Sequence, residues 1–185
     1  MRDTNYTVYD LILIGSMIGF FSIFFYYLSP SFGNWWNLSW ERSNGQFDIN
    51  INAFGYNKNI QVLKSFSLYS GLIYTIGVSL ALISSIKRRI VLSLFSVLLM
   101  LSGLTSFLII LFNSRFIYNA IVENTETHIK KASLFCGRKG ELSWGLGIGF
   151  YLAVISTILI SIAIIIKFSL SLVEKKRSSI SKSIN

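Results

Sequence analysis

The side chains that could perform chemistry are few. His128 is the only histidine and Cys136 the only cysteine among the 185 residues. Glu123, Glu126 and His128 form a small group that could bind a metal weakly, although a solvated loop face is the favoured interpretation. A structural zinc site needs four Cys or His ligands, and a haem held by two histidines needs a second histidine. The sequence therefore predicts no metal, no cofactor and no catalytic residue, and a protein that is not an enzyme.

Four long apolar stretches carry no charged residue in their interiors. Each approaches or exceeds the ~20 residues that a helix needs to cross ~30 Å of hydrocarbon. Membrane enzymes and ion-coupled transporters generally keep ionisable groups at that depth for their function, so these stretches argue against both classes. The stretches are residues 8–28, 70–86, 90–112 and 146–173.

These stretches predict an all-α transmembrane four-helix bundle, with residues 1–185 forming a single integral membrane domain. We expect the first stretch to remain as a helix rather than to be removed as a signal peptide, because its apolar core is longer than a typical signal segment. Two outer loops then connect the helices, at about residues 29–69 and 113–145. A small extracellular β-hairpin or sheet is expected in the first of them.

The net charge of +9 is distributed in a way that favours membrane orientation over nucleic-acid binding. Basic clusters occupy the short turn between the second and third stretches and the segment after the fourth. Short segments rich in Lys and Arg stay on the cytoplasmic side, so both termini are predicted to be cytoplasmic in the cell membrane. The lipid bilayer is then a partner and nucleic acid is not. The residues that set this topology are Lys87, Arg88, Arg89, Lys175, Lys176 and Arg177.

Two segments of the first outer loop alternate apolar and polar residues with the period of a strand. They flank Ser43-Asn44-Gly45, which suits a turn, so we predict two antiparallel strands. An isolated hairpin is marginal in water, and its apolar face must pack on the membrane surface, the second outer loop or another protein. Trp35, Trp36 and Trp40 have a second interpretation, as interfacial anchors of the first helix or as packing within the loop. The candidate interaction surface is Trp36, Trp40, Phe47 and Ile49.

Further expectations concern the second outer loop and the small residues. The third helix is expected to continue past Arg115 to about Glu123 as a rigid stalk, and a strand at residues 132–136 could pair with the hairpin. Asn37-Leu38-Ser39 is a glycosylation acceptor in a host with the machinery. Small residues four apart allow helices to approach closely, within the bundle or between subunits. These packing residues are Gly15, Gly19, Gly145, Gly149 and Ala153.

This plan resembles the claudin and peripheral-myelin-protein superfamily of four-span membrane proteins. The shared elements are cytoplasmic termini, a long first outer loop with strand pattern and tryptophans, a short basic turn, an overlong third span and a shorter second outer loop. Ser143-Trp144-Gly145 and the following Gly149 to Ala153 look like the opening of the fourth span in those proteins. Trp36 and the segment Asn37 to Trp40 echo the first-loop motif, but the two cysteines of that motif are missing.

The resemblance implies a non-enzymatic protein that associates laterally or between cells through its outer loops, with itself or with other membrane proteins. Adhesion and scaffolding are the roles that this implies. The alternative is an accessory subunit of a larger membrane enzyme or respiratory complex, which would explain why the chain has no chemistry of its own. A transporter or channel component is less favoured, because the sequence supplies no charged pathway.

Overall fold

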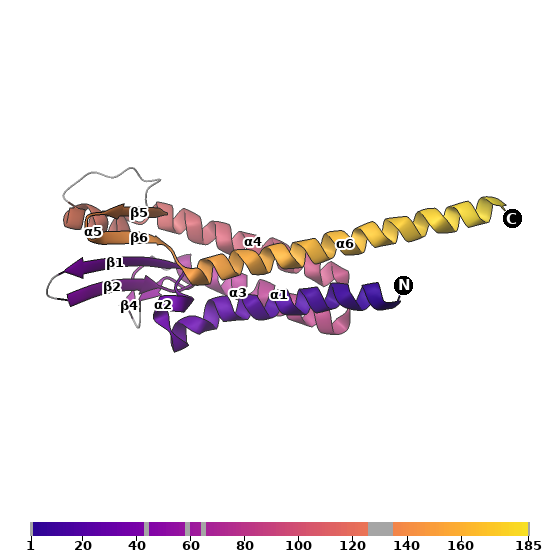
Figure 1. Cartoon of the computed structure of the whole chain (residues 1–185), viewed down its shortest axis with the longest axis horizontal. Helices are drawn as coiled ribbons and strands as arrows, with labels where there is room; N and C mark the ends of the chain where they lie inside the picture. The colour runs from indigo at the N-terminus through magenta and orange to yellow at the C-terminus, as the bar shows by residue number, and fades with distance from the viewer. Residues whose placement is uncertain (1, 43–44, 58–59, 64–65, 126–134, 185) are drawn as a thin grey trace.

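The computed structural model describes most of the chain, which is elongated (Figure 1). The backbone is described for residues 2–42, 45–57, 60–63, 66–125 and 135–184. Within these ranges, the side chains outside the description are those of residues 2–6, 40–42, 45–47, 60, 61, 66, 120, 123–125 and 174–184.

Four long apolar helices form the body of the described protein, as predicted. They are α1 (Arg2–Leu28), α3 (Phe66–Lys87), α4 (Ile90–Phe112) and α6 (Ile148–Ile184). The main difference from the predicted spans is at the start of α3, which precedes residue 70. Its first turn is held in place because Ser67 is buried and its hydroxyl donates to the carbonyl oxygen of Phe54 at 3.0 Å. The helices are long and apolar enough to cross a membrane over Thr7–Leu28, Ser67–Lys87, Ile90–Phe112 and Ile148–Val173.

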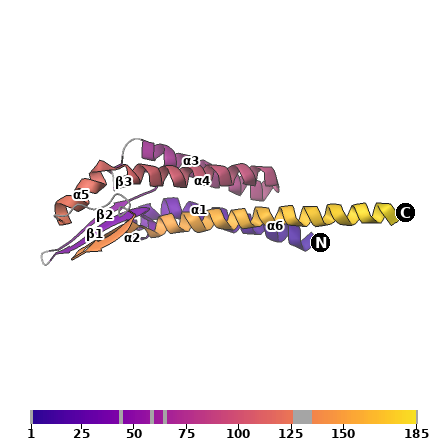
Figure 2. The same ribbon diagram turned by 90° about the horizontal axis from the view of Figure 1, so that it is seen from above.

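The helices pack in two layers, with α3 beside α4 and α1 beside α6 (Figure 2). Both chain termini and the turn between α3 and α4 lie at the same end of the bundle (Figure 1). This end is termed the terminal end. The strands lie at the opposite end, termed the sheet end, and α6 extends beyond the other helices at the terminal end (Figure 1).

The strands join segments that are far apart in the sequence. The described strands are β1 (Trp36–Arg42), β2 (Gly45–Ile51), β3 (Tyr56–Asn57), β4 (Ile60–Gln61), β5 (Cys136–Lys139) and β6 (Leu142–Leu146). Four of them form an antiparallel sheet of order β2-β1-β6-β5, while β3 and β4 pair separately. The predicted hairpin is confirmed as β1 and β2, with Trp36 opposite Ile51 and Trp40 opposite Phe47. The described part of the second loop does pair with this hairpin, through β6. Residues 132–134 of the predicted strand lie outside the described residues, and its last residue, Cys136, begins β5.

The predicted continuous stalk is wrong, because a break separates α4 from α5 (Arg115–Thr125) (Figure 2). Asn113 Nδ2 donates to the carbonyl oxygen of Ile109 at 2.8 Å, which satisfies an acceptor in the last turn of α4. Ser114 Oγ accepts the backbone N–H of Ile117 at 3.3 Å and so caps the start of α5. Short polar side chains that bond the backbone locally compete with helix continuation. The chain therefore forms two helices here instead of one.

Gly15 and Gly19 lie where α1 packs against neighbouring helices. A Cβ atom at Gly15 would lie 2.7 Å from Cγ1 of Ile160, and one at Gly19 would lie 2.8 Å from Oγ of Ser156. The Ser156 hydroxyl in turn donates to the carbonyl oxygen of Gly15 at 2.6 Å. This seam between α1 and α6 is intramolecular, and larger side chains would force the two helices apart.

Gly145 does not belong to a helical row with Gly149 and Ala153, which corrects the sequence-based prediction. Gly145 lies in β6, where the strand is paired on both sides by β1 and β5. Pairing on both sides satisfies the backbone groups of this segment, so α6 begins only after the strand. Gly149 packs on the carbonyl oxygen of Gly33, and the carbonyl of Ala153 accepts the Tyr74 hydroxyl at 3.1 Å.

The turn between α3 and α4 is held against α1 by hydroxyl groups. The Tyr9 hydroxyl donates to the carbonyl oxygen of Arg88 at 2.7 Å, and Ser85 Oγ donates to the carbonyl of Tyr9 at 2.8 Å. Ser84 Oγ donates to the carbonyl of Arg89 at 2.8 Å. Arg88 adopts a positive φ of 52°, which allows the tight reversal. These bonds keep the basic turn at a defined place at the terminal end.

Candidate functional site: the sheet and its junction with the helices

Reactive side chains do not gather in the described part of the structure. No three His, Cys, Asp or Glu residues among those described lie close enough to hold a metal ion. Glu126 and His128 of the predicted weak metal group lie outside the described residues, as does the side chain of Glu123. Cys136 is exposed on β5 and forms no disulfide, and Asp10 is exposed near the terminal end.

Several hydroxyl groups within the apolar helices bond to their own helix, while Ser85 and Ser156 bond to the backbone of α1. Thr75 donates to a carbonyl one turn earlier at 2.7 Å, and Ser79, Thr157 and Ser161 do the same at 2.8–2.9 Å. Such bonding is ordinary for Ser and Thr in helices. These side chains are therefore packing residues and do not form a polar pathway.

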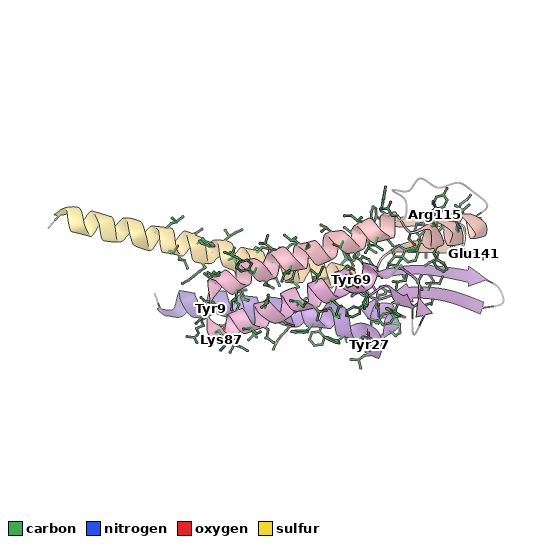
Figure 3. All side chains as sticks on the ribbon, turned by 180° about the vertical axis from the view of Figure 1, so that it is seen from behind. Tyr9, Tyr27, Tyr69, Lys87, Arg115 and Glu141 are labelled. Atoms are coloured by element: carbon green, nitrogen blue, oxygen red, sulfur yellow. The ribbon has the colours of Figure 1, made fainter. Side chains whose placement is uncertain are left out.

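A pocket of about 280 Å³ lies beside the break between α4 and α5. Among the described residues that line it, Arg115 is the only charged one, and Figure 3 shows it at the sheet end. General acid–base chemistry needs a proton donor or acceptor with a suitable pKa, and an arginine in an apolar pocket does not provide one. The described residues that line the pocket are Val62, Ile109, Ile110, Asn113, Ser114, Arg115 and Phe116.

Trp35 connects the sheet to all four long helices. Its side chain is 0% exposed, and its indole N–H donates to the carbonyl oxygen of Ser22 in α1 at 2.9 Å. Its ring makes edge contacts with Tyr74 of α3, Phe107 of α4 and Phe150 of α6, at centroid distances of 5.2, 5.1 and 5.6 Å. Edge-to-face pairs add to the energy of burial alone. One side chain thus ties the base of the sheet to the bundle.

The backbone around Trp35 is bonded on both sides. Its N–H donates to the carbonyl oxygen of Ile51 at 2.7 Å, and its carbonyl accepts the N–H of Gly147 at 3.0 Å. The carbonyl of Asn34 accepts the N–H of Gly149 at 2.8 Å, at the first turn of α6. The segment before β1 is therefore fixed to β2 on one side and to the start of α6 on the other.

The short helix α2 (Pro30–Gly33) folds the chain back against the end of α1. A Cβ atom at Gly33 would overlap the backbone nitrogen and Cα of Tyr26, so this approach requires glycine. The Tyr26 hydroxyl donates to the carbonyl oxygen of Asn50 at 2.8 Å, and Asn34 Nδ2 donates to Asn50 Oδ1 at 2.8 Å. These hydrogen bonds fix the position of β2 relative to the end of α1.

Trp36 and Ile49 do not lie on an exposed interaction surface, which corrects that prediction. Trp36 is 1% exposed and Ile49 is 9% exposed. Their face of the sheet packs in the interior because its residues are large and apolar, and α5 contributes isoleucines to the same cluster. Trp40 and Phe47 pair through their backbones, but their side chains lie outside the described residues. Other members of this buried cluster are Leu38, Ile51, Ile117, Ile121, Leu142 and Trp144.

The opposite face of the sheet is polar. One row crosses all four strands in register and consists of Asp48, Ser39, Ser143 and Arg138, in the order β2-β1-β6-β5. Asp48 and Arg138 are exposed, and Ser39 Oγ donates to Asp48 Oδ1 at 2.6 Å. A second row lies closer to the bundle and consists of Asn50, Asn37, Gly145 and Cys136. These eight residues are termed the polar face, and they include the asparagine of the glycosylation motif.

Among the described side chains where the bundle meets the sheet end, tyrosines are exposed and tryptophans are buried. Tyr27, Tyr69 and Tyr151 are 64%, 58% and 55% exposed, and come from α1, α3 and α6. Figure 3 shows Tyr27 and Tyr69 near the sheet end, and Tyr9 and Lys87 at the opposite end. Lys87, Arg88 and Arg89 are exposed there. The side chains of Lys175, Lys176 and Arg177 lie outside the described residues.

Sequence reasoning missed two features of this site. Trp35 was interpreted as an interfacial anchor or as a packing residue within the loop, because nothing in a local pattern shows that its ring contacts three of the long helices. The polar face did have a signal, since Asn37, Ser39 and Asp48 are the alternate members of the same period-2 segments. Burial of the apolar members of these segments leaves the polar members on the accessible face.

The fold and composition define a helical protein with four helices in its described part that are suited to crossing a membrane. Comparisons with models of protein families, with curated proteins and with solved structures found no match.

Proposed function

We propose that the chain spans the membrane four times, with the sheet end outside and both termini in the cytoplasm. Exposed tyrosines are typical of a membrane interface, and basic residues are typical of the cytoplasmic end. Along α3, Lys87 lies roughly 27 Å from Tyr69, and along α6 Lys167 lies roughly 24 Å from Tyr151, at ~1.5 Å per residue. These spacings are close to the ~30 Å thickness of the hydrocarbon core.

The single native cysteine gives a direct test of this orientation. Cys136 is exposed on β5, so a maleimide that cannot cross membranes should label it in intact cells. The variant Cys136→Ser should not be labelled. A cysteine placed at Ser181, near the C-terminal end of α6, in that background should react only after lysis. The reverse pattern, with labelling of Cys136 only after lysis, would contradict the proposed orientation.

We further propose that the protein is a non-enzymatic membrane protein that associates with other proteins, or with itself, through the polar face. The observation that carries this proposal is the two-sided sheet: one face is buried in the protein's own core, and the other face is polar. The row of Asp48, Ser39, Ser143 and Arg138, termed the charged row, has exposed residues at both ends and half-buried serines between them. The buried Trp35 side chain and the backbone hydrogen bonds of Trp35 to Ile51 and Gly147 hold this face in place on the bundle. A preorganised surface loses little conformational entropy when it binds, which favours recognition.

Substitution at the centre of the polar face tests this function. Ser143 lies between Ser39 and Arg138 in the charged row, so Ser143→Arg should add bulk and charge in the middle of the contact. We expect proteins cross-linked to the wild-type chain in native membranes to fall at least tenfold in yield, as expected for loss of a central contact worth about 1.4 kcal/mol or more.

Glu141→Arg is the matched control for this experiment. Glu141 is exposed in the turn between β5 and β6, outside the polar face (Figure 3). Its replacement introduces the same arginine side chain as Ser143→Arg. Its cross-linking should equal that of the wild type. An unchanged set of cross-linked proteins with Ser143→Arg would remove the proposal, and a stoichiometric set of redox or transport subunits would favour the accessory-subunit alternative.

The relation to the claudin-like superfamily belongs to this proposal as well. In its favour are the strand-bearing segment between the first two long helices, the short basic turn, and a second loop that adds strands to the sheet. The helix break after Phe112 removes the overlong third span from the list of shared elements. The proposed adhesion or scaffold role rests on the polar face and does not depend on this relation.

A further inference from the structure

We infer that the pocket beside the break between α4 and α5 binds an anionic phospholipid, with the phosphate at Arg115 and an acyl chain against the apolar wall. The observation that carries this inference is the lining of the pocket, which is apolar on the side of α4 and cationic beyond it. The site is separate from the polar face. The leaflet that supplies the lipid rests on the proposed orientation of the protein, whereas the chemistry of the pocket does not.

The pocket lies at the depth where α4 leaves the hydrocarbon region. Ile110 lies roughly 30 Å along α4 from Ile90, the first residue of this helix, at ~1.5 Å per residue. That distance matches the ~30 Å thickness of the hydrocarbon core. Figure 3 shows Arg115 on the sheet side of Tyr69, which is one of the exposed tyrosines. The pocket is therefore at the boundary between acyl chains and headgroups.

The two ends of the pocket differ in chemistry. Ile109 and Ile110 belong to the last turn of α4, and Ile109 is 62% exposed, so the apolar end opens toward the surrounding lipid. Val62 and Phe116 complete the apolar wall. Arg115 forms the cationic end, and its side chain is exposed. A membrane lipid presents its acyl chain and its phosphate in the same order, from the bilayer centre outward.

Arg115 is the described lining residue best suited to a phosphate. Its guanidinium carries five N–H donors in a planar fork, which can bind two phosphate oxygens together. The other polar side chains of the lining bond to nearby backbone groups: Asn113 Nδ2 donates to the carbonyl of Ile109, and Ser114 Oγ accepts the N–H of Ile117. Among the described side chains, no carboxylate pairs with Arg115.

The same lining favours an anionic lipid over a zwitterionic one. A zwitterionic headgroup would bring an ammonium group close to Arg115, and the described part of the lining offers no carboxylate to compensate for this repulsion. The volume of about 280 Å³ is just below the ~300–1,000 Å³ of typical ligand pockets. The pocket therefore holds the upper part of one lipid, and the rest of its acyl chains lies in the bilayer.

A free phosphate ion is a poorer ligand for this site than a phospholipid. An exposed arginine gains little from a single ion in water, because both charges are well hydrated. Burial of acyl chain against the apolar wall supplies additional favourable free energy. The charge of Arg115 then selects among lipids, while the apolar wall provides much of the affinity.

Retention of single lipids by the purified protein provides the test. The whole chain is extracted in a non-ionic detergent, titrated with phosphatidylglycerol or with phosphatidylcholine of the same acyl chains, and measured by native mass spectrometry. We expect half-saturation with one phosphatidylglycerol at a concentration at least fivefold lower than with phosphatidylcholine. Arg115→Gln should weaken retention of phosphatidylglycerol at least fivefold and change that of phosphatidylcholine less than twofold.

Two further variants show whether the pocket is the site of retention. Arg89→Gln removes the same charge from an exposed residue at the terminal end, so retention should stay within twofold of wild type. Phe116→Ala keeps Arg115 but shortens the apolar wall, and it should weaken retention at least threefold. Equal losses in the two arginine variants would show that retention follows net charge, and would overturn the inference. Full retention by Phe116→Ala would overturn it as well.

The remaining outcomes separate the lipid from other ligands and from the proposed orientation. Equal retention of the two lipids, or displacement of phosphatidylglycerol by inorganic phosphate in equal amount, would overturn the inference. If Cys136 is labelled only after lysis and Arg115→Gln still loses phosphatidylglycerol, the orientation fails and the pocket takes its lipid from the inner leaflet. If labelling of Cys136 is as expected and Arg115→Gln retains the lipid fully, the orientation stands and the pocket assignment is wrong.

Discussion

Replacing Trp35 with alanine should lower the free energy of unfolding by about 3–5 kcal/mol, the range for removal of a large aromatic residue from a packed core. The ring is fully buried and contacts aromatic residues of three helices, and its N–H bonds to the fourth. Its loss would leave a cavity at the one point where all four helices meet the sheet. Unfolding in mixed micelles, followed by far-UV circular dichroism, measures the change without relying on tryptophan fluorescence.

Two further variants separate the contributions of Trp35. Trp35→Phe keeps an aromatic ring but removes the bond to the Ser22 carbonyl, so it should cost the value of that bond, about 1 kcal/mol, plus part of the packing. Phe21→Ala truncates an aromatic residue that is 58% exposed on α1 and should cost much less than Trp35→Ala. If the Trp35→Ala and Phe21→Ala variants unfold at the same detergent composition, the junction does not have the role assigned to it.

Gly33→Ala should be the second most damaging change, with an expected loss of about 3 kcal/mol, at the upper end of the usual cost of overpacking. The added methyl group would overlap the backbone of Tyr26 at the end of α1, and a backbone atom cannot rotate away as a side chain can. Relief requires α2 to move off α1. That movement would disturb the bonds that Tyr26 and Asn34 make to Asn50.

Gly145→Ala is a matched control, since it makes the same chemical change in a segment with space. The nearest atom to a Cβ at Gly145 is the carbonyl oxygen of Phe135 at 3.4 Å, an ordinary contact. We expect this variant to remain within about 0.5 kcal/mol of wild type. The measurement is the temperature at which half of the detergent-solubilised protein is lost from the monodisperse peak. Equal midpoints for the two variants would contradict the close crossing of α1 and α2.

The elements that could be predicted are those with a local signal. The four helices follow from charge-free apolar stretches, and the hairpin follows from alternation around a turn. Its register, with Trp36 opposite Ile51, came from the structure. The break after Phe112 also had a local signal in Asn113-Ser114, but the apolar pattern continues across it. Helical periodicity alone therefore predicted one helix where side-chain capping produces two.

The start of the fourth helix shows why other features could not be predicted. Gly145, Gly149 and Ala153 have helical spacing. Gly145 nevertheless lies in β6, because it pairs with Asn37 of β1, which is more than a hundred residues away in the sequence. Periodicity describes how residues relate to their neighbours in sequence. It carries no information about a distant strand that competes for the same backbone groups.

The sequence by itself determined the four apolar helices, the hairpin and the basic turn, because hydropathy and turn chemistry act over a few residues. Tertiary structure decided which face of the sheet is buried, and it assigned Trp35 to the meeting point of four helices. An alternating segment has two faces, and burial of either is compatible with its pattern until another element covers one of them. Here the apolar face with Trp36 and Ile49 is buried in the core, so the polar face is the accessible one, with Asp48 and Arg138 exposed at its edges.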